Sequence, residues 1–118
     1  MKIIEFLNQA NKVKTYTREQ ILSMPIGTEL DELAISMTFG KSPWNSCMPS
    51  LRHMDSIVIQ EIAINQGEEY IWHLASITGA EMETGFVKWG ETLLLATPEQ
   101  RTKAAILALL EQSGGTGE

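Results

Sequence analysis

The first helical pattern in the chain is short and clearly bounded. Thr17 is followed three residues later by Gln20, the spacing of a capping box in which side chains and backbone of the first turn pair reciprocally. Apolar residues follow until Pro25, which has no backbone N–H to continue a helix. The sequence therefore predicts a helix over residues 17–23, and a further short helix over residues 2–10 before it.

A longer helical pattern begins at Thr28, with Asp31 three residues later. Its apolar positions recur three or four residues apart and are Leu30, Leu33, Ala34 and Met37. Acidic side chains in the first turn interact favourably with the helix dipole, and Gly40 is a common C-terminal stop. The sequence predicts a helix over residues 28–39.

The next segment, residues 41–50, is a proline-flanked loop that contains Trp44. Ser50 is placed to cap a following helix, whose apolar residues would share one face. Those residues are Leu51, Met54, Ile57 and Val58. Residues 57–59 are β-branched and also suit a strand, but the helical spacing favours a helix.

Between residues 69 and 89 the pattern changes to alternation. In residues 69–77, successive side chains would point alternately to the two faces of a strand. Residues 84–89 form a second short alternating run, after a loop that contains Gly79. A period of two is typical of strands. The sequence predicts an antiparallel pair, which needs further strands or helices on its face to be stable.

The last element has three independent start signals: a cap at Thr97, a proline at position 98, and Gln100 at the capping-box position. They predict a helix over residues 98–112, followed by a flexible tail over residues 113–118. The order of helices, strands and helix predicts a single α+β domain over residues 1–112. In it, a small antiparallel sheet packs between helices as an α/β/α sandwich.

Composition and charge limit the classes of function that the sequence allows. The chain has 118 residues, of which 43% are hydrophobic, and a formal net charge of −6. This charge argues against coating of extended nucleic acid, which needs a positive field. A small anionic ligand in a local basic pocket stays compatible with it, because nearby donors outweigh a distant net charge. The apolar runs are too short to span a membrane, which predicts a cytoplasmic protein.

Candidate catalytic and metal-binding groups are few. Cys47 is the single cysteine, so no intrachain disulfide is possible, and it is expected to be a buried structural residue. Together with His53 and His73 it lacks the paired short spacings of zinc sites. A Cys47–His53 hydrolase is the least favoured hypothesis, and the sequence predicts neither a catalytic site nor a metal nor a cofactor.

Candidate ligand-binding residues lie on the second predicted strand and at the starts of two predicted helices. Phe86 and Lys88 share one face of the predicted second strand, where an aromatic ring beside a cation suits a stacked base and a phosphate. The alternative is a core strand with Lys88 reaching into solvent. The two later helix starts also suit an anion, because helix N-termini carry free amides and partial positive charge. The residues there are Ser50 and Arg52, and Thr97, Arg101 and Lys103. Simple capping is the alternative, and Trp44 is either a core plug or a contact residue.

Several segments resemble the phage ABA-sandwich domain family. Residues 28–33 resemble its Gly-x-Glu-Leu-Asp-type helix, and residues 49–58 are similar to its central helix. Residues 90–92 and 103–108 resemble its closing Gly-Glu-Thr and Arg-Ala-Ala-Leu-type segments. The resemblance covers about residues 18–111 and implies a layered α+β sandwich.

Residues 25–29 and the Thr-Gly-Phe segment at residues 84–86 also resemble phage anti-Thoeris sponge proteins of the first described type. Those proteins sequester cyclic ADP-ribose signals, and some hold cyclic oligonucleotides, as homo-oligomers that do not cleave the ligand. The resemblance implies the same anti-defence function here, in the cytoplasm of an infected bacterium. It implies base stacking on Phe86, and the basic residues placed to bind phosphates are Arg101, Arg52, Lys88 and Lys103.

A second hypothesis needs no nucleotide. An accessory protein could dock onto a host or phage protein through an apolar, acidic-rimmed surface. The net charge of −6 suits a basic protein partner better than an anion.

Overall fold

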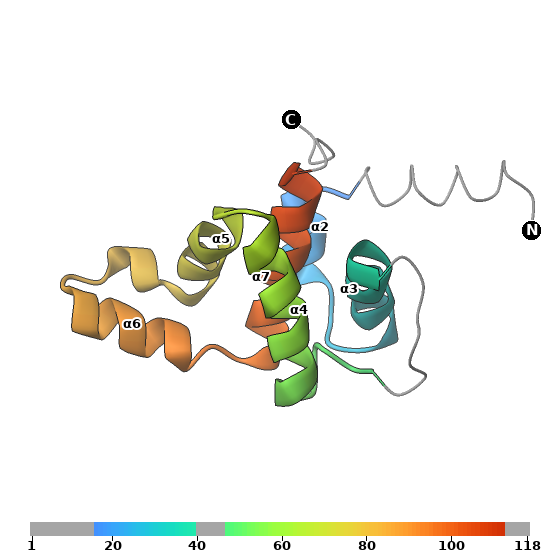
Figure 1. The fold of residues 1–118 in the computed structure, drawn as a ribbon, viewed down its shortest axis with the longest axis horizontal. Coiled ribbons are helices and arrows are strands. Elements are labelled where there is room, and N and C mark those ends of the chain that lie inside the picture. Colours follow the sequence, from blue (N-terminus) through green and yellow to red (C-terminus); the bar gives the residue numbers. More distant parts are fainter. Residues whose placement is uncertain (1–15, 40–46, 113–118) are drawn as a thin grey trace, which may run out of the picture.

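The computed structural model describes residues 16–39 and 47–112, and every regular element in these residues is helical (Figure 1). The elements are α2 (Arg18–Ser23), α3 (Thr28–Phe39), α4 (His53–Gln66), α5 (Glu69–Thr78), the 3-10 helix η1 (Ala80–Met82), α6 (Phe86–Leu94) and α7 (Pro98–Gln112). The predicted α+β class with an antiparallel sheet is therefore wrong, and the described chain is all-α.

The helices α2, α3 and α7 confirm the sequence predictions. α2 opens with the predicted capping box, in which Gln20 N donates to Thr17 Oγ1 at 3.1 Å and Thr17 N donates to Gln20 Oε1 at 2.8 Å. The same reciprocal bonds join Thr97 and Gln100 at the start of α7. The predicted helix over residues 2–10, Gly40, Trp44 and the tail over residues 113–118 lie outside the described residues.

The last helix, α7, is the centre of the fold. It packs against α2 and α3 on one side and against α4 and α5 on the other (Figure 1). Nearly all of its residues from Arg101 to Leu110 are buried. A helix enclosed on all sides needs apolar residues around its whole circumference, which explains the unbroken apolar run at residues 104–110.

Two core clusters share α7 between them. The first joins α2, α3 and α7, and its buried residues are Ile21, Met24, Leu30, Leu33, Ala34, Ile106, Leu107 and Leu110. The second joins α4, α5 and α7, and its buried residues are Ile59, Ala63, Tyr70, Leu74, Ala96, Ala104, Ala105 and Ala108. α7 thus presents its large side chains to α2 and α3, and its alanines to α4 and α5. Because alanine is small, α4 and α5 can approach α7 closely.

The segment predicted as the first strand is α5. Its buried residues, Tyr70, Leu74 and Ala75, recur at helical spacing, whereas Trp72, which alternation would place on the same face, is 61% exposed. α7 offers this segment a helical surface to pack against, and no strand of the described chain lies beside it. Gly79, at φ 85°, ends the helix in the left-handed conformation that glycine adopts most readily.

The segment predicted as the second strand begins α6. Gly85, at φ 93°, precedes the helix, which then continues five residues beyond the predicted strand. Residues two apart on a helix point about 200° from each other. Phe86 and Lys88 therefore do not share a face, and their predicted pairing on a strand is wrong.

The N-terminus of α4 also differs from the prediction. The residue at its N-cap is Arg52, and Ser50 lies in the preceding turn. The buried face consists of Ser56, Ile59 and Ala63, whereas Leu51 and Met54, two residues of the predicted apolar face, are exposed.

Candidate functional site

Arg101, a predicted phosphate ligand, lies in the interior of the domain. It is only 4% exposed, and its guanidinium donates to His53 Nδ1 at 2.9 Å and to the Leu94 carbonyl at 3.3 Å. These bonds connect α7 to the start of α4 and to the end of α6. A guanidinium that is buried to this extent offers almost no surface to an external anion.

Lys103 is engaged in the same way on the other side of α7. It is 5% exposed, and its Nζ donates to the Leu22 carbonyl at 2.7 Å and to Glu99 Oε2 at 2.8 Å. The carbonyl is one of those left without a helical partner near the end of α2. Lys103 therefore joins α2 to α7, and the carboxylate of Glu99 balances its charge.

The two hydroxyl candidates serve the backbone. Ser50 is buried; its Oγ accepts from Gly27 N at 3.2 Å, and its own N–H donates to Asp31 Oδ1 at 2.7 Å. Ser50 thereby ties the loop before α4 to the start of α3. Thr97 is exposed, and its Oγ1 accepts from Gln100 N in the capping box of α7.

The other predicted residues lie apart from each other. Phe86 is 94% exposed at the start of α6, and Lys88 is exposed on the opposite face of that helix. Arg52 is exposed at the start of α4, and Trp44 lies outside the described residues. Phe86 is about 12 Å along the helix axis from Leu94, whose carbonyl contacts Arg101. The structure therefore does not bring the predicted binding residues together into one pocket.

The Cys47–His53 pair does not have the properties of a thiolate catalyst. Cys47 is buried, and its pKa is raised by desolvation and then by the carboxylates of Asp55 and Asp31. His53 Nδ1 accepts a hydrogen bond from Arg101. A raised pKa keeps the thiol protonated and weakly nucleophilic. Within the described ranges, no group of three His, Cys, Asp or Glu side chains could hold a metal ion.

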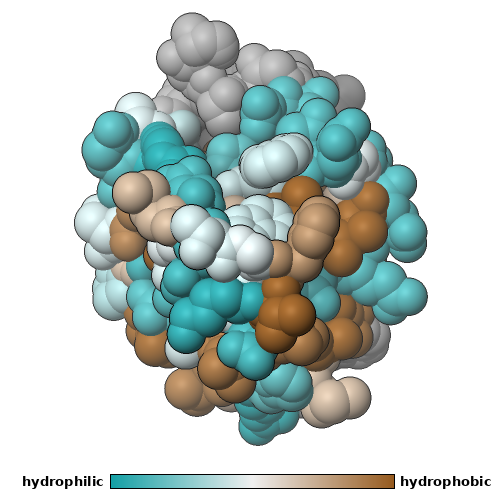
Figure 2. Space-filling model, turned by 90° about the vertical axis from the view of Figure 1, so that its left-hand side faces the viewer, coloured by the Kyte–Doolittle hydropathy of each residue, from teal (hydrophilic) through white to brown (hydrophobic). Residues whose placement is uncertain are grey.

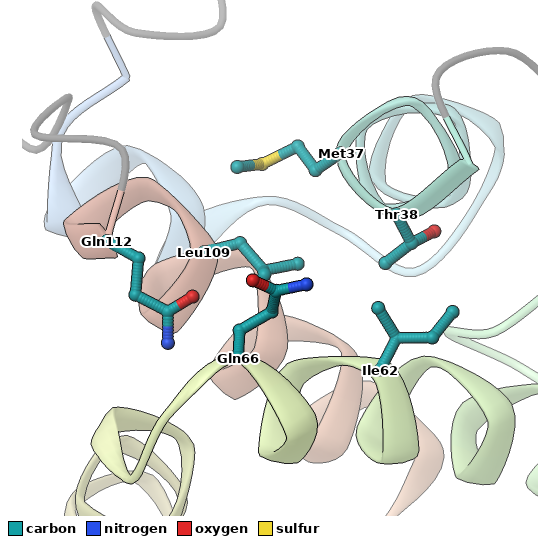
Figure 3. A pocket seen from close by; sticks show the side chains of 6 residues that line it. All are labelled: Met37, Thr38, Ile62, Gln66, Leu109 and Gln112. Carbon is teal, nitrogen blue, oxygen red and sulfur yellow. The ribbon is translucent and has the colours of Figure 1, made fainter.

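A cavity of about 320 Å³ lies between α3, α4 and α7 (Figure 3). Its lining residues are Met37, Thr38, Ile62, Gln66, Leu109 and Gln112. None of these six is charged, and the Gln112 amide already donates to Glu69 Oε1 at 2.8 Å. The volume suits a small apolar molecule, but the lining offers no cation to bind a phosphate.

The largest departure from ordinary burial lies at the opposite end of the molecule, around α6. Six large apolar side chains there are strongly exposed; they are Trp72 (61%), Met82 (81%), Phe86 (94%), Val87 (75%), Leu94 (78%) and Leu95 (80%). We call these six residues the α6 surface. Figure 2 views the molecule from this end and shows apolar residues among hydrophilic ones. α6 itself has no buried residue.

Only one side of α6 contacts the rest of the molecule. The Trp89 ring meets Trp72 of α5 edge-on, with centroids 6.3 Å apart and planes at 66°. Leu93 packs against the second core cluster, and the Thr92 hydroxyl donates to Glu83 Oε1 at 3.5 Å. These contacts fix the orientation of the helix. The neighbouring part of the circumference, which runs from Phe86 through Gly90 to Leu94 and Val87, is the outward side, and its three side chains are strongly exposed.

Gly90 lies at the middle of this outward side, one turn from Phe86 and one turn from Leu94. A Cβ added at position 90 would meet no atom within 4 Å, and the residue has ordinary helical backbone conformation. Glycine inside a helix is less stable than alanine by roughly 0.5–1 kcal/mol. Packing within the described chain therefore gives no reason for a glycine here.

The segment that carries most of the α6 surface is acidic. Residues 80–95 contain three acidic side chains, Glu81, Glu83 and Glu91, and one lysine, so they carry a net charge of −2. Glu81 precedes Met82 in the sequence, and Glu91 lies one helical turn from Val87 and from Leu94; both glutamates are exposed. An anionic ligand is therefore disfavoured at this end of the molecule, whereas a cationic partner is favoured.

Comparison with protein-family models, curated proteins and solved structures finds no match for this chain. In the described part of the chain, no helix combines the length and apolar character needed to cross a bilayer.

Sequence reasoning missed the α6 surface, although a signal for it was present. Phe86, Gly90 and Leu94 recur four residues apart, and Trp89 and Leu93 form a second such pair. Treating residues 84–89 as a strand broke this pattern and concealed the amphipathic helix.

Proposed function

We propose that this protein acts by binding another protein through the α6 surface. The observation that carries the proposal is the exposure of Phe86, Val87 and Leu94 on the outward side of one helix. Single exposed apolar residues are common on proteins, but a group of this size on one element is typical of an interaction site.

The size of the surface supports the proposal. A large aromatic side chain offers roughly 150–250 Å² for burial. Phe86 is almost fully exposed, and Trp72 is more than half exposed. With the four aliphatic side chains added, the α6 surface reaches the several hundred Å² at which apolar patches mark binding sites. One partner in a stable complex commonly buries about 800 Å².

The fixed orientation of α6 also favours binding. The edge-on contact of Trp89 with Trp72, and the packing of Leu93 on the core, hold the helix against α5. A partner would therefore meet a surface that is already ordered, which reduces the entropy lost on association.

The experiment is site-specific photo-crosslinking of the full chain in the cells that produce it. A photoreactive residue replaces Val87 in one variant and Ile26, in the α2–α3 loop, in another. We expect position 87 to give one dominant protein adduct, which position 26 does not give. Phe86→Asp in the position-87 variant should remove the adduct. Equal adducts from both positions, or none from position 87, would contradict the proposed function.

The nucleotide sponge is a second candidate function, and it stays a prediction from the family resemblance. Phe86, Lys88 and Arg52 are exposed and thus accessible to a ligand. A ligand gathered between protomers could use them together, whereas Arg101 and Lys103 lie in the interior. This function requires a cyclic nucleotide that raises the thermal midpoint of the purified protein.

A further inference from the structure

The occupant of the α6 surface can be narrowed by the shape of the helix. Phe86 and Leu94 project from the outward side on either side of Gly90, which has no side chain. The distance at which two helices pack depends on the side chains at their contact point. At Gly90 the backbone of α6 is open to close approach, and Phe86 and Leu94 flank the approaching element. This shape suits a second helix that crosses α6 at Gly90.

Charge decides which kind of helix fits. Residues 80–95 carry a net charge of −2, and exposed Glu91 follows Gly90 directly. A helix with lysine or arginine beside its apolar face would be attracted, whereas a second copy of this chain would bring the same excess of carboxylates. Repulsion between two such surfaces disfavours a symmetric pair of α6 helices.

We propose that the α6 surface binds a basic amphipathic helix of another protein, which crosses α6 at Gly90. Apolar side chains of that helix pack between Phe86 and Leu94, and its cations face the carboxylates around the surface. This inference rests on the proposed function, and it specifies the chemistry of the partner.

The first test uses two synthetic helical peptides with the same leucine stripe. In one peptide the flanking positions are lysine, and in the other they are glutamate. Fluorescence anisotropy measures binding of each labelled peptide to the full chain. We expect the lysine peptide to bind at least about tenfold more tightly, and to weaken as salt rises, because salt screens the attraction. Equal affinities, or no binding of either peptide, would overturn the inference.

The second test locates the crossing point. Gly90→Leu places a bulky side chain at the proposed contact while favouring the helix, so the thermal midpoint should not fall. We expect it to weaken the lysine peptide at least about tenfold. Lys88→Leu is the matched control, because it adds the same side chain about 160° around the helix from Gly90. If both variants weaken binding equally, the crossing at Gly90 is wrong.

Failure of this inference can be told apart from failure of the proposed function. Sedimentation of the full chain at low and high salt shows whether the protein associates with itself. Self-association that Phe86→Asp removes, and that grows stronger with salt, would make a second copy the occupant. The inference would then be wrong, although the α6 surface would still be a protein-binding site. A monomer that gives no crosslink from position 87 and binds neither peptide would contradict both.

Discussion

The two helices α7 and α6 differ more in their number of buried residues than any other pair of elements in the described chain. α7 has nine buried residues and α6 has none, yet both carry several large apolar side chains. α7 even buries charged groups, Arg101 and Lys103, each with a partner. α6 leaves Phe86 and Leu94 in solvent. The comparison teaches that apolar content alone does not show whether a helix builds the core or a binding surface.

The largest effect should come from matched leucine truncations in the two helices. Leu107→Ala removes a side chain that is 1% exposed, and we expect a loss of about 2–5 kcal/mol in the free energy of unfolding. Leu94→Ala removes one that is 78% exposed, and should change stability by about 0.5 kcal/mol or less. Urea denaturation of both variants measures the difference. Similar losses would mean that α6 is part of the core.

The next effect tests whether Arg101 is structural. Arg101→Ala leaves the Leu94 carbonyl and His53 without this donor, so we expect a loss of about 1–3 kcal/mol in the free energy of unfolding. Lys88→Ala, on the exposed face of α6, is the control and should stay within about 0.5 kcal/mol of the wild type. A stable Arg101→Ala protein would return Arg101 to the candidate ligand residues.

A smaller effect of opposite sign is expected at Gly90. Gly90→Ala adds a methyl group into open space and reduces the entropy of the unfolded chain. The free energy of unfolding should rise by roughly 0.5–1 kcal/mol. Thermal unfolding, followed by circular dichroism, measures it. A loss of stability would show that position 90 packs against something inside the domain, and would remove it from the binding surface.

The smallest expected effect is that of cyclic nucleotides. Because Arg101 and Lys103 are engaged, we expect no change in the thermal midpoint with cyclic ADP-ribose isomers or cyclic oligonucleotides. A ligand at a hundredfold excess over its dissociation constant would add about 2.7 kcal/mol. A shift of that size with one ligand, kept in Ile26→Ser and lost in Phe86→Asp, would make the sponge the better hypothesis.

The parts of the fold that follow local rules were predictable. The capping boxes at Thr17 and Thr97 bond through neighbours three residues away, and both helices begin where these signals indicate. The prediction failed at residues 69–89, where apolar residues are so frequent that they fit periods of both 2 and 3.6. There the neighbouring element, α7, determined that α5 is a helix.

The features of the candidate site likewise separate into those set by the local sequence and those set by tertiary packing. The sequence by itself determined the acidic charge of residues 80–95, the helix caps and the apolar run of α7, because each depends on composition or on neighbours within one turn. Only the tertiary structure decided that Arg101 and Lys103 lie in the interior and that Phe86 lies outside. Burial depends on which distant segments pack together, so the same residue types can stabilise the core in one helix and remain available to a partner in another.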